Sequence, residues 1–447
     1  MTKTLKKRRI VLLMYCLVVL LLAVLSRPAG AVNDGWVKLL GTALTEFSSG
    51  IAVDSAGNIY VTGFTEGQLG GEFNSGAVDI FLAKYDGKGI RQWVKLLGTA
   101  SGEVGCGVVV DSAGAIYVTG YTMGNLGGET NAGGQDIFLA KYDGSGTRQW
   151  VKLLGTKSLS EGGSGLATGP NDSIYVTGYT DGNLGETNAG GEDVFLAKYD
   201  GSGTREWVKL LGTTQTEEGT GVAVDSVGSI YVTGFTRGDL GGETNAGGVT
   251  NFLAKYDGVG TRQWVKLLGS AMAGYSGIAL DPGGNIYVAG ITCLDMGGET
   301  NAGDYDIFLA KYDGSGTKQW VKLLGTEMTD SSHSVVVDSV GAIYITGGTR
   351  GNLGGETNAG GEDIFLAKYD SSGARQWVKL LGTISWEDGN GMAADASGNI
   401  YITGNTGGNL DGKINAGGED IFMWKYSESS ESFPWEIFYP AIMKKRQ

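Results

Sequence analysis

The chain is poor in cysteine, proline and histidine, with three, five and one of these residues among 447. So few cysteines exclude a disulfide framework, and Cys106 and Cys293 fall in distant parts of the sequence, which argues against a bridge between them. Five prolines beside 80 glycines exclude collagen and proline-rich disorder. One histidine is too little for most acid–base sites, so His333 is expected to be a loop residue without catalytic work.

A long hydrophobic run occurs once, near the N-terminus. Basic residues precede the apolar run from Ile10 to Leu25, and Ala29-Gly30-Ala31 fits a small-x-small cleavage site. Residues 1–31 are therefore predicted to be a signal peptide, with an uncleaved membrane anchor as the alternative. Export would place the protein outside the cell, on the cell surface or in the periplasm.

The charge balance indicates which partners to expect. Removal of residues 1–31 leaves 28 basic and 48 acidic residues, a net charge of −20. Such a surface repels nucleic acid and anionic lipid, and it favours cations or basic partners.

The abundant glycines and aromatic residues recur at fixed intervals. The segment Trp-Val-Lys-Leu-Leu-Gly returns every 57 residues, with one interval of 56. Its tryptophans are expected to be structural: Trp36, Trp93, Trp150, Trp207, Trp264, Trp320 and Trp377.

Each repeat unit reads as four short strands joined by turns. In the first unit the predicted strands are 50–54, 58–65, 79–85 and 91–98, with tight hairpins after the first and third. One antiparallel meander cannot bury both faces, whereas seven arranged radially can. The predicted fold is an all-β, seven-bladed β-propeller over residues 32–426.

The patterns GIAVDSAGNIYVTGFT and DIFLAKYDGSG, followed by QW and LGT, carry a resemblance to a known family. They resemble the seven-bladed β-propeller repeat of bacterial and archaeal secreted and cell-surface proteins. The resemblance implies a fold and no particular activity, because propellers host many functions.

The order of the strands also predicts how the ring closes. No Trp-Val-Lys-Leu-Leu-Gly segment follows the last third strand, 421–426, but one copy at 36–41 precedes the first complete unit. We predict that strand 36–41 pairs antiparallel with strand 421–426 and completes the seventh blade.

Acidic residues recur four positions before the predicted innermost strand in six units: Glu46, Glu103, Glu161, Glu217, Asp330 and Glu387. In a propeller these positions surround one mouth of the channel, where a ring of carboxylates would bind Ca²⁺ weakly. The alternative is that each carboxylate caps its own loop. No cofactor is expected beyond this weak calcium binding.

A second acidic set precedes the third strand and is expected to satisfy loop N–H groups: Asp79, Asp136, Asp193, Asp306, Asp363 and Asp420. Residues 427–447 read as a polar linker and a short apolar tail with a basic end. The tail either contacts the membrane or envelope peripherally or folds onto the propeller.

The near-identity of the units favours a non-catalytic binding or scaffold module for an extracellular protein or glycan. An active site needs unlike residues at one place. The alternative is a propeller lyase or hydrolase that uses the acidic ring with a metal ion, and its candidate cluster is Asp330, His333, Glu387 and Asp388. A structural surface-layer component is a third hypothesis.

Overall fold

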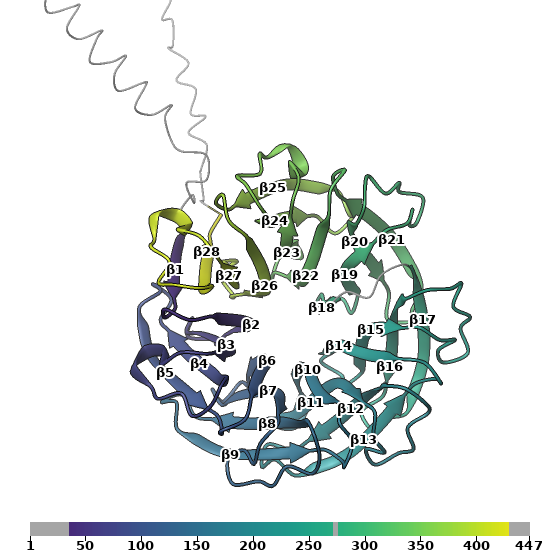
Figure 1. Ribbon diagram of the computed structural model, residues 1–447. Coiled ribbons are helices and arrows are strands. Elements are labelled where there is room, and N and C mark those ends of the chain that lie inside the picture. The colour runs from purple at the N-terminus through teal and green to yellow at the C-terminus, as the bar shows by residue number, and fades with distance from the viewer. Residues whose placement is uncertain (1–34, 271–275, 429–447) are drawn as a thin grey trace, which may run out of the picture.

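The computed structural model describes residues 35–270 and 276–428, which form seven four-stranded antiparallel sheets arranged in a ring (Figure 1). The predicted seven-bladed propeller is therefore confirmed. The predicted signal peptide and the C-terminal tail from residue 429 lie outside the described residues. Among the described residues, no helix has the length and apolar character needed to cross a bilayer.

Each blade runs from the channel outward in the order of the chain, and the strands fall into four classes. The innermost strands are β2 (Glu46–Val53), β6 (Glu103–Val110), β10 (Glu161–Gly169), β14 (Glu217–Val224), β18 (Gly277–Leu280), β22 (Asp330–Val337) and β26 (Glu387–Ala394). The second strands are β3 (Ile59–Thr65), β7 (Ile116–Thr122), β11 (Ser173–Thr180), β15 (Ile230–Thr236), β19 (Ile286–Thr292), β23 (Ile343–Thr349) and β27 (Ile400–Thr406).

The third strands are β4 (Asp79–Tyr85), β8 (Asp136–Tyr142), β12 (Asp193–Tyr199), β16 (Thr250–Tyr256), β20 (Asp306–Tyr312), β24 (Asp363–Tyr369) and β28 (Asp420–Tyr426). The outermost strands are β5 (Arg91–Leu97), β9 (Arg148–Leu154), β13 (Arg205–Leu211), β17 (Arg262–Ser270), β21 (Lys318–Leu324), β25 (Arg375–Leu381) and β1 (Trp36–Leu40). Short 3₁₀ turns are η1 (Leu69–Gly71), η2 (Pro170–Asp172), η3 (Leu353–Gly355) and η4 (Leu410–Gly412).

The second and third strands are apolar at successive positions because both of their faces are covered. In β4 the residues from Asp79 to Ala83 are all buried, so the alternation typical of a half-exposed strand is missing. Their side chains pack in clusters that join two neighbouring blades, such as Tyr60 and Ile80 with Val118 and Phe138. The core is thus divided among the junctions between blades.

The innermost strands begin four residues earlier than predicted. β2 starts at Glu46, which pairs with Thr65, whereas the sequence indicated a strand from residue 50. The polar stretch 46–49 looks like a loop in the sequence. It nevertheless pairs with β3, and a register shift between Ser48 and Gly50 interrupts the ladder.

The repeated tryptophans dock between blades. Trp93 of the first blade lies against Gly146, which is in the turn between β8 and β9 of the second blade. A Cβ added at Gly146 would sit 3.1 Å from the indole. Gly146 has a φ of +83°, which a residue with a side chain rarely adopts. The same contact recurs between Trp36 and Gly89 and between Trp150 and Gly203. The glycine-rich turn is therefore both a hairpin and a seat for the tryptophan of the preceding blade.

The predicted ring closure is confirmed. β1 pairs antiparallel with β28, with Trp36 opposite Lys425 and Leu40 opposite Ile421 (Figure 1). Side chains add a second connection at the channel. The Asn405 amide of the seventh blade donates to the Glu46 carbonyl at 2.6 Å and accepts from the Ser48 N–H at 3.3 Å. The sequence analysis missed this asparagine, which stands where Tyr121 and Tyr179 stand in other blades.

Candidate ligand site at the channel mouth

A cavity of about 650 Å³ lies where the innermost strands begin, and all seven blades contribute to its wall. This volume is within the range of small-molecule sites, which is roughly 300–1,000 Å³. We call this cavity the channel mouth. Connections between blades and the long loops between second and third strands share this end of the ring.

A β-bulge in each of six innermost strands turns one side chain toward the channel mouth. The bulged residue has no partner in the ladder, so its side chain leaves the regular alternation. The six bulged residues that line the cavity are Ser49, Cys106, Ser164, Thr220, His333 and Asn390.

Two further positions beside each bulge also differ from blade to blade. On the innermost strands these residues are Phe47, Val104, Gly162, Glu218, Ser331 and Asp388. Their partners on the second strands are Phe64, Tyr121, Tyr179, Phe235, Gly348 and Asn405. The third strands, by contrast, read DIFLAKY in four of the seven blades. Differences between blades are therefore concentrated at the channel mouth.

Aromatic side chains form the wall of the mouth on the first three blades. Phe47 stacks on Phe64 with ring centroids 5.6 Å apart and planes 8° apart. The Tyr179 ring lies over Gly162, where an added Cβ would approach the phenol oxygen to 2.7 Å. Tyr121 and Tyr179 both line the cavity. Such rings offer flat apolar faces together with hydroxyl groups.

Glu218 stands beside these tyrosines on β14. Burial and then the nearby Glu192 carboxylate raise the pKa of Glu218 to about 7, although Ser164 donates a hydrogen bond to it. Glu218 in turn contributes to the raised pKa of Tyr179. Burial, followed by Glu218, raises the pKa of the Cys106 thiol to about 12, so this cysteine is a neutral thiol at physiological pH.

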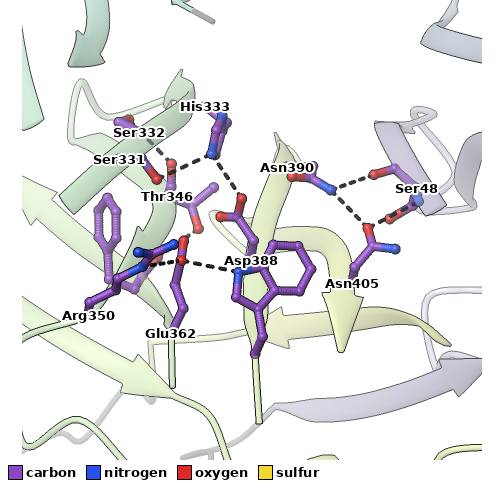
Figure 2. A network of polar contacts seen from close by, with 12 residues as sticks. Ser48, Ser331, Ser332, His333, Thr346, Arg350, Glu362, Asp388, Asn390 and Asn405 are labelled. Atoms are coloured by element: carbon purple, nitrogen blue, oxygen red, sulfur yellow. Dashed lines mark hydrogen bonds and ion pairs between the residues drawn. The ribbon is translucent and has the colours of Figure 1, made fainter. Parts of the chain in front are cut away.

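A second polar cluster lies at the junction of the sixth and seventh blades (Figure 2). His333 Nε2 lies 3.0 Å from Asp388 Oδ2, and Arg350 Nε lies 3.0 Å from Glu362 Oε2. Burial lowers the pKa of His333, but Asp388 and then Glu362 outweigh it and hold the pKa above its usual value. Both carboxylates of this junction thus have a basic partner.

This cluster does not have the geometry of a serine hydrolase triad. Ser331 Oγ and Asp388 Oδ2 both approach the same nitrogen of His333, at 3.4 and 3.0 Å. A triad needs the serine at one ring nitrogen and the carboxylate at the other. His333 also lies on the innermost strand β22, so the expectation that it is a loop residue was wrong.

The four residues proposed for an enzymatic cluster separate into two environments. His333 and Asp388 meet at the channel mouth, whereas Asp330 and Glu387 are completely buried. Asp330 accepts hydrogen bonds from Thr326 and Thr349, and Glu387 accepts them from Thr383 and Thr406. The sequence placed all four side by side because it did not reveal which way each side chain points.

All six carboxylates of the predicted ring are completely buried, and none of them lines the cavity. Glu46 accepts from the Thr42 N–H at 2.6 Å, the Thr42 hydroxyl at 2.7 Å and the Thr65 hydroxyl at 2.8 Å. A pair of threonines holds each of the other five in the same way. This is the arrangement that the loop-capping alternative describes. Weak calcium binding stays a prediction.

The second acidic set lies next to the first across each blade junction, which the sequence did not indicate. Asp420 of the seventh blade contributes to the raised pKa of Glu46 in the first, after burial as the main cause. Each of the six aspartates receives a loop N–H on one oxygen, as for Asp79 and Ser75 at 2.7 Å, while its other oxygen lacks a hydrogen-bond partner within the described residues. Burial raises the pKa of Asp363 to about 6.

Neither cysteine nor metal chemistry emerges from the described part of the chain. Cys106 and Cys293 are not joined in a disulfide bond, and no group of three or more histidine, cysteine, aspartate or glutamate side chains of the described residues is arranged to hold a metal ion.

The ring of seven blades around an open mouth defines a seven-bladed β-propeller with a central site. Five stretches of the chain, residues 35–70, 92–127, 206–241, 319–355 and 376–411, match the model of the family described as Beta-propeller repeat. These five stretches are copies of this β-propeller repeat.

Two curated proteins are similar to the chain. An uncharacterized WD repeat-containing protein, L264, of Acanthamoeba polyphaga mimivirus is 25% identical over 70% of this chain and 30% of the relative. The regulatory protein FlaEY of Caulobacter vibrioides is 26% identical over 77% of this chain and 40% of the relative. The chain therefore spans less than half the length of these relatives.

Among solved structures, the WD40 β-propeller domain of Doa1 is similar, with a TM-score of 0.49 and 10% identity, covering 88% of this chain and 98% of that one. The gluconolactonase XC5397 of Xanthomonas campestris has a TM-score of 0.38 and 12% identity, covering 88% and 90% of the two chains.

Proposed function

We propose that this protein is an exported, non-catalytic binding module that holds an extracellular protein or glycan partner at the channel mouth. One observation supports the proposal above all others. In six blades whose third strands are near copies of one another, the strand residues differ at three positions beside the bulge, and most of these residues line one cavity. Fold maintenance alone gives no reason for such a restricted set of differences, whereas recognition of a ligand requires unlike groups at one place.

A pull-down experiment tests the proposal. The immobilised protein is exposed to culture supernatant and envelope extracts of the cells that produce it, and bound molecules are identified by mass spectrometry. A Tyr179→Ala variant, which alters the mouth, is expected to lose the partner. A Val227→Ala variant, which changes a side chain that is 85% exposed in the turn between β14 and β15, at the opposite end of the ring, is expected to keep it. Equal capture by both variants would place the binding surface elsewhere.

The proposal of export has its own test. Fractionation of these cells, with mass spectrometry of the protein's N-terminus, is expected to find a chain starting near Val32 outside the cytoplasm. A protein retained in the cytoplasm with Met1 intact would contradict it.

A lyase or hydrolase is the second candidate, and the His333–Asp388 pair is the observation that favours it. This pair has the residue types of an acid–base couple and lies in the cavity wall. Under our proposal a screen of lyase and hydrolase substrates gives no turnover. Turnover that disappears in His333→Ala would make the enzyme the better description.

A further inference from the structure

Two junctions of the ring share one framework but differ in charge. At the junction of the sixth and seventh blades, Glu362 and Asp388 are accompanied by Arg350 and His333. At the junction of the third and fourth blades, Glu192 and Glu218 occupy the equivalent positions. Glu192 directly precedes the third strand β12, as Glu362 precedes β24, and Glu218 is the second residue of the innermost strand β14, as Asp388 is of β26. The equivalents of Arg350 and His333 there are Asp181 and Ser164.

The junction of the third and fourth blades therefore lacks an internal cation. No lysine, arginine or histidine side chain of the described residues forms an ion pair with Glu192 or Glu218. Glu192 accepts a hydrogen bond from the Ser160 hydroxyl at 2.8 Å, which is a neutral partner. Two carboxylates held near each other without a cation favour either a proton or a bound cation between them.

The surroundings of Glu218 favour an organic cation. The Tyr121 and Tyr179 side chains line the same part of the cavity, and an ammonium group is attracted to the face of an aromatic ring. The Ser164 hydroxyl beside Glu218 offers a further oxygen. No lysine or arginine of the described residues lines the cavity, and the histidine that does, His333, lies on β22, two blades away from Glu218 on β14, where it is paired with Asp388.

Asp388, the other carboxylate that lines the cavity, is not available to a cation in the same way. Its Oδ2 lies 3.0 Å from His333 Nε2, and its Oδ1 is buried beside Gly348. Glu218 is therefore the carboxylate of the cavity wall that lacks a basic partner among the described residues.

We propose that the channel mouth binds a ligand through a primary ammonium group, which lies between Glu218 and the rings of Tyr121 and Tyr179. This inference rests on the proposed binding function and specifies its ligand. The chemistry is shared by a lysine side chain of a partner protein and by a free linear diamine.

Isothermal titration calorimetry at pH 7 tests the inference with 1,5-diaminopentane and with Nα-acetyl-lysine methylamide. We expect saturable binding of at least one of them, and no binding of the Nε-acetylated lysine derivative, which has lost its charge. Burial and Glu192 raise the pKa of Glu218 to about 7, so Glu218 is about half protonated at the pH of the experiment. A bound cation favours the ionised carboxylate, so binding is expected to release protons. The measured enthalpy should therefore depend on the ionisation enthalpy of the buffer.

Matched variants assign the site. Glu218→Gln is expected to weaken binding at least about tenfold, which is 1.4 kcal/mol, while Glu243→Gln, an exposed loop glutamate paired with Lys266 on the same blade, leaves it unchanged. The double substitution Ser164→His with Asp181→Arg, which copies the residues of the sixth blade, is expected to abolish binding by supplying the cation internally.

The two sources give different patterns. Binding of the diamine alone indicates a free amine, and binding of the lysine derivative indicates a protein side chain. The inference would be overturned if Glu218→Gln and Glu243→Gln bound the amine with equal affinity. It would also be overturned if neither amine bound with a Kd below about 10 mM, which is a binding free energy weaker than about 3 kcal/mol. A partner captured through Tyr179 despite that result would leave the binding function intact.

Discussion

Neighbouring glutamates on β14 show how one residue of separation changes the role of a carboxylate. Glu217 is completely buried, and Thr213 and Thr236 hold it by their hydroxyl groups. Glu218 points the other way into the channel mouth and has a pKa of about 7. Alternation along the strand thus gives a structural carboxylate and an energetically unfavourable one side by side.

Replacing a carboxylate of the buried set is expected to destabilise the protein. In Glu46→Gln one oxygen becomes an NH₂ group, and this donor meets either the Thr42 N–H or the hydroxyl groups of Thr42 and Thr65. The free energy of unfolding should fall by about 1–3 kcal/mol. Urea denaturation measures this, with Glu72→Gln as the control, because Glu72 forms an exposed ion pair with Lys95 that is worth at most about 1 kcal/mol. Equal losses in both variants would contradict a structural role for the buried set.

Replacing Glu218 is expected to have the opposite effect at high pH. Its folded-state pKa is raised from 4.5 to about 7, so the folded protein holds the proton more tightly than the unfolded chain. The cost of ionisation is therefore absent below the unfolded pKa, grows between pH 4.5 and pH 7, and is constant above the folded pKa. The full shift corresponds to about 3 kcal/mol, and solvent screening of a partly exposed side chain reduces it. Glu218→Gln should therefore be more stable than the parent protein by about 1–2 kcal/mol at pH 8 and nearly equal to it at pH 4. A variant that is less stable at pH 8 would show that Glu218 supports the fold.

The sequence identified the buried carboxylates, but of the residues at the channel mouth it singled out only His333 and Asp388. Glu46 and its equivalents stand out because their residue type repeats, whereas Glu218, Tyr179 and Asp388 stand out only because they do not. Comparing the seven units position by position would have revealed this signal. Which residues face the cavity depends on the bulge, and the sequence of residues 46–49 does not indicate it.

At the scale of single elements, the glycine turn between the third and outermost strands supports two interactions at once. It reverses the chain, and it receives the tryptophan of the preceding blade. Trp377 of the sixth blade packs on Tyr426 at the end of β28, with ring centroids 5.1 Å apart.

Two glycines with the same backbone conformation allow the tryptophan contact to be measured. Gly114 and Gly146 have φ values of +84° and +83°, but an added Cβ meets nothing within 4 Å at Gly114 and the Trp93 indole at 3.1 Å at Gly146. Both alanine variants pay the strain of a left-handed backbone, roughly 1–2 kcal/mol. Gly146→Ala should lose more stability than Gly114→Ala by thermal or urea unfolding. Equal losses would mean that the indole moves aside freely.

Most strands were predictable from the sequence, and the errors in their predicted bounds have a physical cause. Second and third strands are continuous apolar runs, so their bounds were close to those observed, such as 58–65 against Ile59–Thr65. Innermost strands carry polar residues where they meet the cavity, so their first four residues looked like loop. A hydrophobic pattern detects a strand by what it buries, and it misses the part of a strand that faces a ligand site.

At the scale of the whole molecule, stability depends on joining the two ends of the described chain. β1 contributes Val37 and Leu40, which are 1% and 7% exposed, to clusters with the seventh and first blades. Asn405 and Asn390 add hydrogen bonds from the seventh blade to Glu46 and Ser48 of the first (Figure 2).

Removal of β1 is expected to weaken the ring without abolishing the blades. A chain starting at Thr42, compared with one starting at Gly35, loses two buried apolar side chains and exposes the edge of β28. Its free energy of unfolding should fall by at least about 3 kcal/mol, and its concentration-dependent association should increase because an open strand edge pairs with other chains. Denaturation and light scattering measure the two effects. Unchanged behaviour in both would show that closure contributes little.

The pairing of β1 with β28 also has a consequence for the order of folding. During synthesis the N-terminal segment emerges first, yet its partner strand is made last, so β1 stays unpaired while the blades between them form from local contacts. Contacts between residues so distant in sequence carry a large loop-closure cost and form slowly. We therefore expect refolding in two kinetic phases, a fast one for single blades and a slow one for closure, with only the slow phase missing from the chain that starts at Thr42.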